Sequence, residues 1–436
     1  MSDISRRALL QMTAAGALAA GAGIGPVFAE AYKPMLPIEK GASLQLLRWT
    51  GFIDADDKQW KANTEAFTKA TGVNVTIQDV SWTDIQAKSG LSAQIGSGPD
   101  VVMGFYDTPF IYPDKLVDVS DVCTYLEKKY DGFYDVAKSY GYDDKTKTWI
   151  AVPMGGPGAC VTYRESWLKE AGFDSFPTDF DGMLKAARAL KKNNHPIGLA
   201  LGHAVGDANA WVHTVLWGFG GKQVDENNKV VINSKETHEA LKYAKALYET
   251  MIPGTGSWLD VNNNQAFLAG QISMTINGIS IWYVAKQKFP EMFPDIRTAP
   301  VPVGPVGHPT NFNLFSQAFI FKYSKYPNAA KEYLRFMNEA PQVAPWVTGM
   351  VGYVTPALKA YSKLPIWTEN PNITPYRDVL VGNYADGYAG SPGRAAATAL
   401  NDFIVVNMFA DACAHGASPE DAAKRAEEKL KQIYNA

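Results

Sequence analysis

The chain has 436 residues, 46% hydrophobic and 19% charged, so it carries enough apolar material for more than one globular core. A formal net charge of −3 gives no electrostatic basis for binding nucleic acid or an acidic membrane surface. Three cysteines are too few for a disulfide scaffold. One Cys123–Cys160 bridge and three free thiols are both compatible with the sequence.

The first 29 residues have the pattern of an export signal. Arg6 and Arg7 precede an Ala/Gly-rich apolar stretch over 12–24, and residues 27–29 fit a small-x-Ala cleavage site. Residues 5–11, "SRRALLQ", resemble the bacterial twin-arginine export signal. No stretch approaches the ~20 apolar residues of a good membrane span. The sequence therefore predicts a cleaved signal over 1–29, a periplasmic mature protein and no stable membrane insertion.

Predicted strands and helices alternate between residues 43 and 105. An apolar strand stops at Trp49, and the next elements are predicted as helix 57–70, strand 73–77, helix 82–95 and strand 100–105. This order is typical of a parallel sheet, in which ligands bind outside the carboxyl ends of the strands. We therefore expect Trp49, Trp82 and Asp107 in a ligand cleft, with a core position as the alternative for Trp49.

The middle and the end of the chain contain further α/β units. A hairpin is predicted around residues 143–145, and the Gly/Pro-rich "MGGPGA" that follows it indicates a crossing between two lobes. Later segments predict a helix capped by Thr178 or Asp179, an aromatic-rich helix in "NAWVHTVLWGFGG" and a C-terminal helix capped by Ser418. The predicted fold class is α/β with two lobes.

In order, these blocks resemble the family 1 extracellular solute-binding proteins of bacterial ABC importers, the maltose-binding-protein type. The resemblance rests on "AFTKATGVNVTIQDVSWTDIQAKSGLSAQIGSGPDVV", "WIAVPMGGPGACVTYRESWLKEAGF", "NQAFLAGQISMTINGISIW" and "NAAKEYLRFMNEAPQVAPW", among others. It implies a type II periplasmic binding protein fold with a ligand cleft between its lobes. Lobe 1 would hold 39–157 plus 307–346, and lobe 2 would hold 158–306 plus 352–436. Hinge crossings are expected near 155–160, 303–309 and 347–353.

Other residues are candidates for the same cleft. Sugars present an apolar face that stacks on aromatic rings, and hydroxyls that bond to carboxylates, amides and guanidinium groups. In the family, a tryptophan often lies two residues after the glycine of the "NG" motif. Here Ser280 takes that place and Trp282 follows it, so either could face the cleft. Trp217 lies six residues after Trp211 and points elsewhere on a helix. The remaining candidates are Trp211, Asn277, Gly278, Trp282, Tyr353, Tyr388 and Arg394.

The sequence lacks the common catalytic and cofactor motifs. It contains no H-E-x-x-H, G-x-S-x-G, P-loop or complete dinucleotide-binding pattern. "DVNNNQ" over 260–265 begins like a calcium loop but lacks the turn glycine and the final glutamate. His203, Asp207 and His213 do not have metal-ligand spacing, so surface or capping roles are expected. We expect no enzyme activity, no cofactor and no metal.

The predicted function is to capture a carbohydrate, meaning a sugar, oligosaccharide or polyol, and to deliver it to the permease subunits of an ABC importer. The protein is expected to act as a monomer and to close on its ligand. One alternative keeps the fold but changes the ligand to a polyamine or an anionic organic solute. A cleft dominated by Asp and Glu would favour the amine, and converging Arg and Lys the anion. A periplasmic carbohydrate-active enzyme is a further alternative, which would need paired carboxylates that meet in space.

Overall fold

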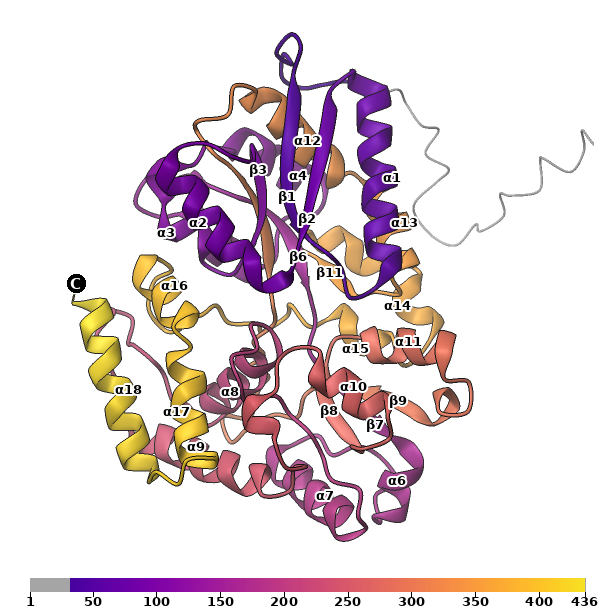
Figure 1. The fold of residues 1–436 in the computed structure, drawn as a ribbon, viewed down its shortest axis with the longest axis vertical. Helices are drawn as coiled ribbons and strands as arrows, with labels where there is room; N and C mark the ends of the chain where they lie inside the picture. Colours follow the sequence, from indigo (N-terminus) through magenta and orange to yellow (C-terminus); the bar gives the residue numbers. More distant parts are fainter. Residues whose placement is uncertain (1–31, 436) are drawn as a thin grey trace, which may run out of the picture. The chain divides into compact units, whose positions relative to one another are not determined.

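Two β-sheets organise the described part of this computed structural model, which covers residues 32–435. The predicted export signal, residues 1–29, lies outside the described residues. A six-stranded sheet has the strand order β11-β6-β10-β3-β1-β2, and a three-stranded sheet has the order β8-β7-β9. Figure 1 shows the six-stranded sheet with α1, α2, α12 and α13, and the three-stranded sheet among α6 to α11.

The amino-terminal strands of the larger sheet are parallel. β1 (Ser43–Trp49) pairs in parallel with β2 (Asn74–Val80) and with β3 (Val101–Phe105), as the strand–helix alternation predicts. The three strands therefore end at the same edge, which brings Trp49, Trp82 and the residues after Phe105 close together. β10 (Ser316–Ile320) then inserts antiparallel between β3 and β6 (Val152–Pro157).

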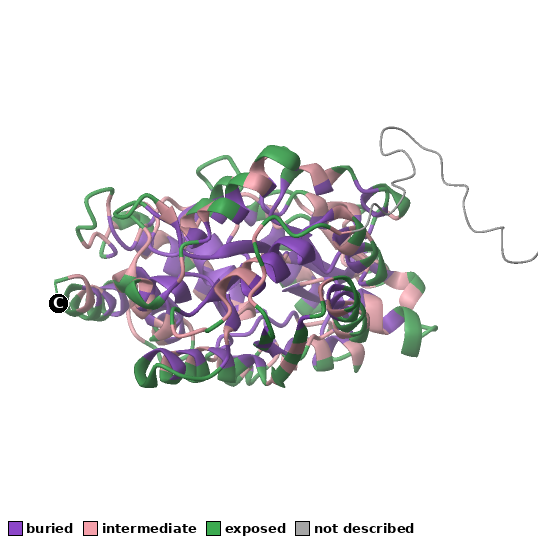
Figure 2. Ribbon diagram, turned by 90° about the horizontal axis from the view of Figure 1, so that it is seen from above, coloured by how far each residue is buried: buried purple, intermediate pink, exposed green. Residues whose placement is uncertain are grey.

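Helices with apolar stripes cover this sheet. α1 (Asp54–Thr71) ends at Gly72, whose φ of 78° is the left-handed conformation expected just past a helix. Its buried Trp60 contacts Trp346 of α13 (Ala340–Gly349), with ring centroids 5.4 Å apart. α2 (Ile85–Ile95), α4 (Ser120–Lys129) and α12 (Pro327–Met337) complete the set. Figure 2 shows buried strands inside and exposed residues along the outer helices.

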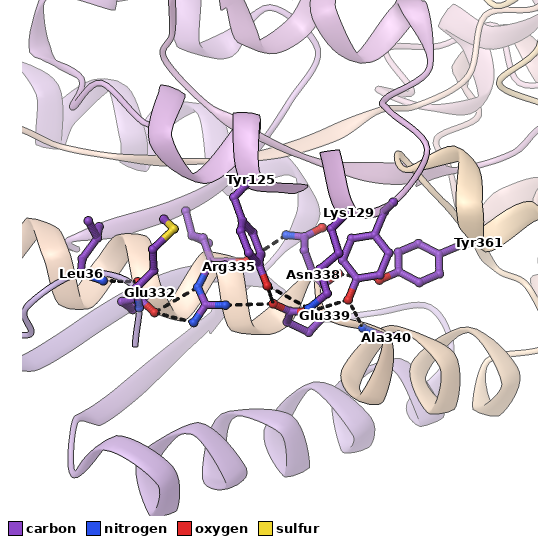
Figure 3. A network of polar contacts seen from close by, with 12 residues as sticks. Leu36, Tyr125, Lys129, Glu332, Arg335, Asn338, Glu339, Ala340 and Tyr361 are labelled. Atoms are coloured by element: carbon purple, nitrogen blue, oxygen red, sulfur yellow. Dashed lines mark hydrogen bonds and ion pairs between the residues drawn. The ribbon is translucent and has the colours of Figure 1, made fainter. Parts of the chain in front are cut away.

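A polar network joins the end of α12 to α4 (Figure 3). Arg335 bonds Glu332 and Glu339 at 2.9 Å each, and Lys129 of α4 lies 2.7 Å from Glu339. Tyr125 donates a 2.8 Å hydrogen bond to the same carboxylate. Burial opposes the ionisation of Glu339, but hydrogen bonds from Lys129 and the tyrosines outweigh it and lower the pKa of this carboxyl group. The network therefore fixes the α12–α13 corner against the rest of the lobe.

The second sheet contains β7 (Cys160–Arg164), with β8 (Met274–Asn277) and β9 (Ile296–Ala299) antiparallel on either side. Side-chain oxygens of Asp179 and Ser418 cap α7 (Phe180–Lys192) and α18 (Pro419–Tyr434). α18 and α17 (Ile404–Cys413) pack together and both contact α9 (Lys235–Tyr248). The other elements here are α6 (Glu165–Glu170), α8 (Asp207–Gly218), α10 (Asn262–Leu268) and α11 (Ser280–Lys288).

Short elements connect these units. The predicted hairpin is present as β4 (Tyr142–Asp143) and β5 (Thr148–Trp149). Cys123 and Cys160 are buried free thiols and Cys413 is half-buried, which decides against a Cys123–Cys160 bridge. The remaining helices are α3 (Thr108–Ile111), α5 (Asp135–Gly141), α14 (Ile366–Glu369), α15 (Thr374–Arg377) and α16 (Arg394–Asn401).

The passage over 347–353 corrects a sequence-based expectation, because the chain does not cross to the second lobe there. β11 (Val354–Pro356) pairs with β6 in the larger sheet, and Lys359 and Ala360 donate backbone hydrogen bonds to Gly132 and Tyr130 of the same lobe. The chain reaches the second sheet later, where Thr298 donates to Asn372 at 3.0 Å. Residues 354–360 therefore lie with the first lobe, and the other lobe boundaries remain a prediction.

The glycines of β6 explain how β11 can attach there. A Cβ at Gly155 would lie 2.1 Å from the Thr355 oxygen, and one at Gly156 would lie 1.8 Å from the Leu314 oxygen. Backbones therefore approach β6 from both sides at distances that only glycine allows. The Gly/Pro-rich segment is thus partly a strand in the sheet core. The crossing between the sheets follows it at Gly158 and Ala159.

Candidate functional site

A cavity lies between the carboxyl-terminal ends of strands in the six-stranded sheet and the second lobe. About 450 Å³ of space free of protein atoms lies in and directly in front of it, because the cavity is open on one side. Residues of the first lobe form an aromatic and apolar wall of the cavity, and residues of the second lobe form a polar wall. Its lining comprises Phe52, Trp82, Pro157, Gly158, Ala159, Gly206, Asp207, Ala210, Asp260, Asn264, Asn277, Gly278, Ser280, Leu314 and Tyr353.

The aromatic wall is built in layers. Trp82 follows the end of β2 and lines the cavity beside Phe52, with the two ring centroids 5.5 Å apart. Behind it, Trp49 meets Trp82 edge-on at 5.2 Å and Phe105 at 4.7 Å. The outer rings therefore rest on inner rings from the ends of β1 and β3, which limits their movement.

An ion network fixes the loop that carries Phe52. Arg48 at the end of β1 bonds Asp56 at 2.6 Å and Asp57 at 2.5 Å, in the first turn of α1. The backbone N–H of Gly51 donates to both oxygens of Asp57, at 3.1 and 3.2 Å. A Cβ at Gly51 would lie 2.6 Å from Asp56 Oδ2, so the loop can lie this close to the carboxylates only with glycine.

The polar wall begins at the first turn of α8. The Asp260 carboxylate accepts backbone hydrogen bonds from Val205, Gly206 and Asp207, at 3.0, 3.0 and 2.8 Å. A carboxylate at a helix N-terminus is stabilised by such donors and by the helix dipole. Asp207 lies beside it, and its Oδ2 accepts a 2.7 Å bond from Asn263. Burial, together with the charge of Asp260, raises the pKa of Asp207 well above its ordinary value.

Amides and a hydroxyl continue this wall from α10 and the β8–α11 turn. Asn277 bonds its side-chain amide to Asn264, and Asn264 donates to Ser280 at 3.2 Å. The N–H of Gly278 is bonded to the Asn277 side chain at 2.6 Å. A Cβ at Gly278 would lie 3.3 Å from the Tyr353 ring, so glycine also lets this tyrosine approach the turn. The wall presents a chain of donors and acceptors opposite the rings.

Comparison with known proteins identifies the family. A family model described as bacterial extracellular solute-binding protein matches residues 62–375, more than half of the chain. The chain belongs to this family. The putative ABC transporter periplasmic-binding protein YcjN of Escherichia coli K12 is 23% identical over 284 residues, which are 63% of this chain and 64% of YcjN. The match therefore covers slightly less than two thirds of that relative's length. A probable ABC transporter-binding protein of Deinococcus radiodurans is 23% identical over 65% of this chain and 69% of its own.

Solved structures show the fold. Maltose-bound MalE3 of T. maritima superposes with a TM-score of 0.77 at 19% identity, covering 90% of this chain and 100% of that one. A sugar transporter of Arthrobacter chlorophenolicus A6 with bound laminaribiose gives 0.76 at 18% identity, over 90% and 99%. The solute-binding protein thus has the mixed α/β fold of maltose-binding-protein-like periplasmic binding proteins. The family description names solute binding, and the two sequence relatives are described as binding proteins of ABC transporters.

Four of the predicted cleft residues line the cavity of this solute-binding protein: Trp82, Asn277, Gly278 and Tyr353. Ser280 lines it as well, whereas Trp282 does not. Ser280 begins α11, and Trp282 is about 200° further around the helix. Trp282 is therefore buried on another side, where it packs against Phe293 with ring centroids 5.1 Å apart.

Two other tryptophans, predicted from the sequence to lie in the cleft, do not line the cavity, which corrects that prediction. Trp49 is 2% exposed and lies in the inner aromatic layer. Trp211 is 1% exposed, donates its indole N–H to the Ala200 oxygen at 2.6 Å, and meets Phe409 of α17. On α8 the first turn faces the cavity, and Trp211 is about 100° around the helix from Ala210, towards the core of the second lobe.

Three more candidates lie away from the cavity. Asp107 directly precedes α3, is buried, and accepts a 3.4 Å hydrogen bond from the backbone N–H of Gly393 instead of capping the helix with its side chain. Tyr388 stacks on Tyr384 at 4.0 Å and lines a separate hollow. Arg394 begins α16 and donates to the Ile111 oxygen at 2.7 Å. All three belong to contacts between the segment over 386–394 and neighbouring elements, so they hold the structure together at a distance from the cavity.

Sequence reasoning missed Phe52, Asp207, Asp260 and Asn264, all of which line the cavity. Asp260 and Asn264 belong to "DVNNNQ", a polar cluster that the sequence indicates only as an imperfect calcium loop. For Asp207 the sequence predicts a surface or capping role. Among the described residues, no group of three or more His, Cys, Asp or Glu is placed to hold a metal ion. None of the described helices combines the length and apolarity that crossing a membrane requires.

Stability should depend on pH through Asp107 and Asp386, which are both buried. Burial and the charge of Asp386 raise the pKa of Asp107 well above its ordinary value, and burial raises the pKa of Asp386 to about 6. Between an ordinary carboxyl pKa of about 4 and pH 6, the folded state therefore binds more protons than the unfolded state. The stabilisation is complete below this window and is lost as pH rises through it.

Asp386→Asn should therefore stabilise the protein more at pH 7 than at pH 4.5, by at least about 1 kcal/mol. Urea denaturation of both proteins at the two pH values measures this difference. The exposed Asp174 offers a matched control, because Asp174→Asn should give the same small effect at both pH values. An effect of Asp386→Asn that does not change with pH would contradict the assignment.

Proposed function

We propose that the protein is an exported periplasmic binding protein, secreted through a twin-arginine-type signal. It captures a carbohydrate in the cavity between its lobes and delivers it, as a monomer, to an ABC import permease. The observation that carries the proposal is the division of the cavity into an aromatic wall and a polar wall. Trp82, Phe52 and Tyr353 offer ring faces, and Asp207, Asn264, Asn277 and Ser280 offer hydrogen-bonding groups.

This division matches the chemistry of a sugar. A pyranose ring has an apolar C–H face that stacks on an indole, and hydroxyls that donate and accept hydrogen bonds. Buried polar groups that are satisfied only by the correct ligand give sharp discrimination, because a wrong ligand leaves them unpaired. The laminaribiose and maltose named for the two structural neighbours support the carbohydrate class.

Direct contacts between the lobes support a closing motion. Tyr106, after β3, donates to the Val205 oxygen at 3.1 Å, directly before α8. On the rim, Tyr283 of α11 donates to Asp54 of α1 at 2.8 Å. These two hydrogen bonds join the lobe of the six-stranded sheet to the lobe of the three-stranded sheet. We expect them to break on opening and to form again when ligand is enclosed.

The charge of the lining disfavours an anionic solute. Asp207 and Asp260 are the charged residues that line the cavity, and neither lysine nor arginine is among the described residues that do so. An anion would therefore face two carboxylates with no opposite charge. A hydrolase mechanism is also disfavoured, because Asp260 is already engaged by three backbone N–H groups.

A thermal-shift screen of the mature chain against sugars, polyols, polyamines and organic anions tests this function. A specific ligand at 100 times its dissociation constant should raise the free energy of unfolding by about 2.7 kcal/mol. At least one carbohydrate should raise the melting temperature in proportion to its concentration. If amines or anions do so and no carbohydrate does, the proposed function is wrong.

A further inference from the structure

Asp207 is the acidic side chain in the cavity that the protein leaves partly unpaired. Its Oδ2 accepts a hydrogen bond from Asn263, while Oδ1 receives none from the described residues. The neighbouring Asp260 differs, because three backbone N–H groups at the start of α8 bond to its two oxygens. The helix terminus thus balances Asp260 and leaves Asp207 as the acceptor that can meet a ligand.

Among the described residues, no cationic side chain forms an ion pair with Asp207 or lines the cavity. On the aromatic side, the guanidinium of the buried Arg48 is already shared between Asp56 and Asp57. The Tyr353 phenol lies between these groups: burial and then the charges of Asp56, Asp207 and Asp260 raise its pKa, and Arg48 only partly opposes this. The cavity thus has two carboxyl groups and no Lys or Arg among its described lining residues, so a positive charge inside it would be stabilised.

We propose that the ligand carries a protonated amine on a hydroxylated ring, as in an amino sugar, and that the amine binds at Asp207. The inference rests on the proposed function and makes its ligand class more specific. An ammonium group donates three hydrogen bonds, which suits the free oxygen of Asp207 and the neighbouring amide oxygens. The ring of the same ligand stacks on Trp82, and its hydroxyls reach Asn264, Asn277 and Ser280.

The aromatic wall favours the same ligand. A cation close to the face of an indole or phenol is attracted by the ring, most strongly when water is excluded. Trp82, Phe52 and Tyr353 line the same cavity as the carboxyl groups, so they can take the apolar face while an ammonium group meets Asp207. A linear polyamine would satisfy Asp207 but has no hydroxyls to add hydrogen bonds with the amides and the Ser280 hydroxyl, so it would bind with fewer polar contacts.

Titration calorimetry of the mature chain with matched probes tests this inference. Glucosamine, galactosamine and the glucosamine disaccharide are compared at pH 7 with their neutral N-acetylated forms, and with glucose, maltose and spermidine. At least one amino sugar should bind about 10-fold or more tightly than its N-acetylated form. Asp207→Asn should remove that preference, measured within the variant as the ratio of its affinities for the amino sugar and the N-acetylated form. Asp174→Asn, an equal charge change on the surface, should leave both affinities unchanged.

The outcomes separate this inference from the proposed function. If neutral sugars bind as well as or better than every amino sugar, the inference is overturned and the carbohydrate function stands. If spermidine binds and no sugar does, both are overturned. If Asp207→Asn keeps the full preference for the amine, the inference is also overturned. Thermal melting of the ligand-free variant verifies that it is folded, so a lost preference reports on the ligand contact.

Discussion

Replacing Trp49 by alanine should lower the free energy of unfolding of the ligand-free protein by about 3–5 kcal/mol, as measured by urea denaturation. The indole is 2% exposed and lies between Trp82 and Phe105, so its removal leaves a cavity under the aromatic wall. Trp49→Phe keeps part of this packing and should cost clearly less. The sequence predicts Trp49 in the cleft with the core as the alternative, and its burial favours the core position, in which it supports the aromatic wall.

Trp82→Ala is the variant with which Trp49→Ala is compared. Trp82 lines the cavity, so its removal should weaken binding of the cognate sugar by about 2 kcal/mol or more, roughly 30-fold. The ratio of binding loss to stability loss should therefore be larger for Trp82→Ala than for Trp49→Ala. Calorimetry and denaturation of the same two variants give both numbers. A larger ratio for Trp49→Ala than for Trp82→Ala would show that Trp49 contacts the ligand.

The first half of the larger sheet was predictable from sequence because its signals are local. Leu44, Leu46 and Leu47 mark a buried strand, and Gly72 marks the end of α1, as observed. The alternation of strands and helices then requires parallel pairing, which β1, β2 and β3 show. β11 could not be found in this way. It has three residues, and its pairing depends on the glycines of β6, about 200 positions earlier in the chain.

The location of the cavity was predictable, but the depth of each side chain in it was not. Strand ends bring Trp49, Trp82 and Phe105 together, yet only the three-dimensional packing decides that Trp82 is outermost. On α8, the sequence predicts the aromatic Trp211 in the cleft, whereas the first turn with Asp207 faces the cavity. Large rings bury most area and therefore tend towards the core. A short polar run such as "DVNNNQ" was the better signal, because its groups need partners or a ligand.

The loop after β1 places Phe52 in the cavity through contacts that lie outside it. Gly51 allows the chain to turn against Asp56 and Asp57, and the turn directs Phe52 into the cavity. The carboxylates that hold the loop are in turn held by Arg48, which is buried at the end of the strand. The geometry of the aromatic wall thus depends on an ion network that does not touch the cavity.

Arg48→Met should therefore have the second large effect, lowering the free energy of unfolding by about 3–5 kcal/mol. The change leaves the buried Asp56 without its guanidinium partner, although Trp346 still donates to Asp56 Oδ1 at 2.6 Å. Any remaining folded protein should also bind sugar more weakly, because the loop that carries Phe52 is released. Urea denaturation and calorimetry measure the two losses.

A double-mutant cycle distinguishes an unpaired charge from lost packing. Asp56→Asn added to Arg48→Met removes the stranded carboxylate, so the double variant should be more stable than Arg48→Met alone. Asp57→Asn alone should cost less than Arg48→Met, because Asp57 is 18% exposed and an asparagine oxygen can still accept from Gly51. If the losses of Arg48→Met and Asp56→Asn simply add, the two side chains are not coupled, and the loop is held by packing instead of by the ion network.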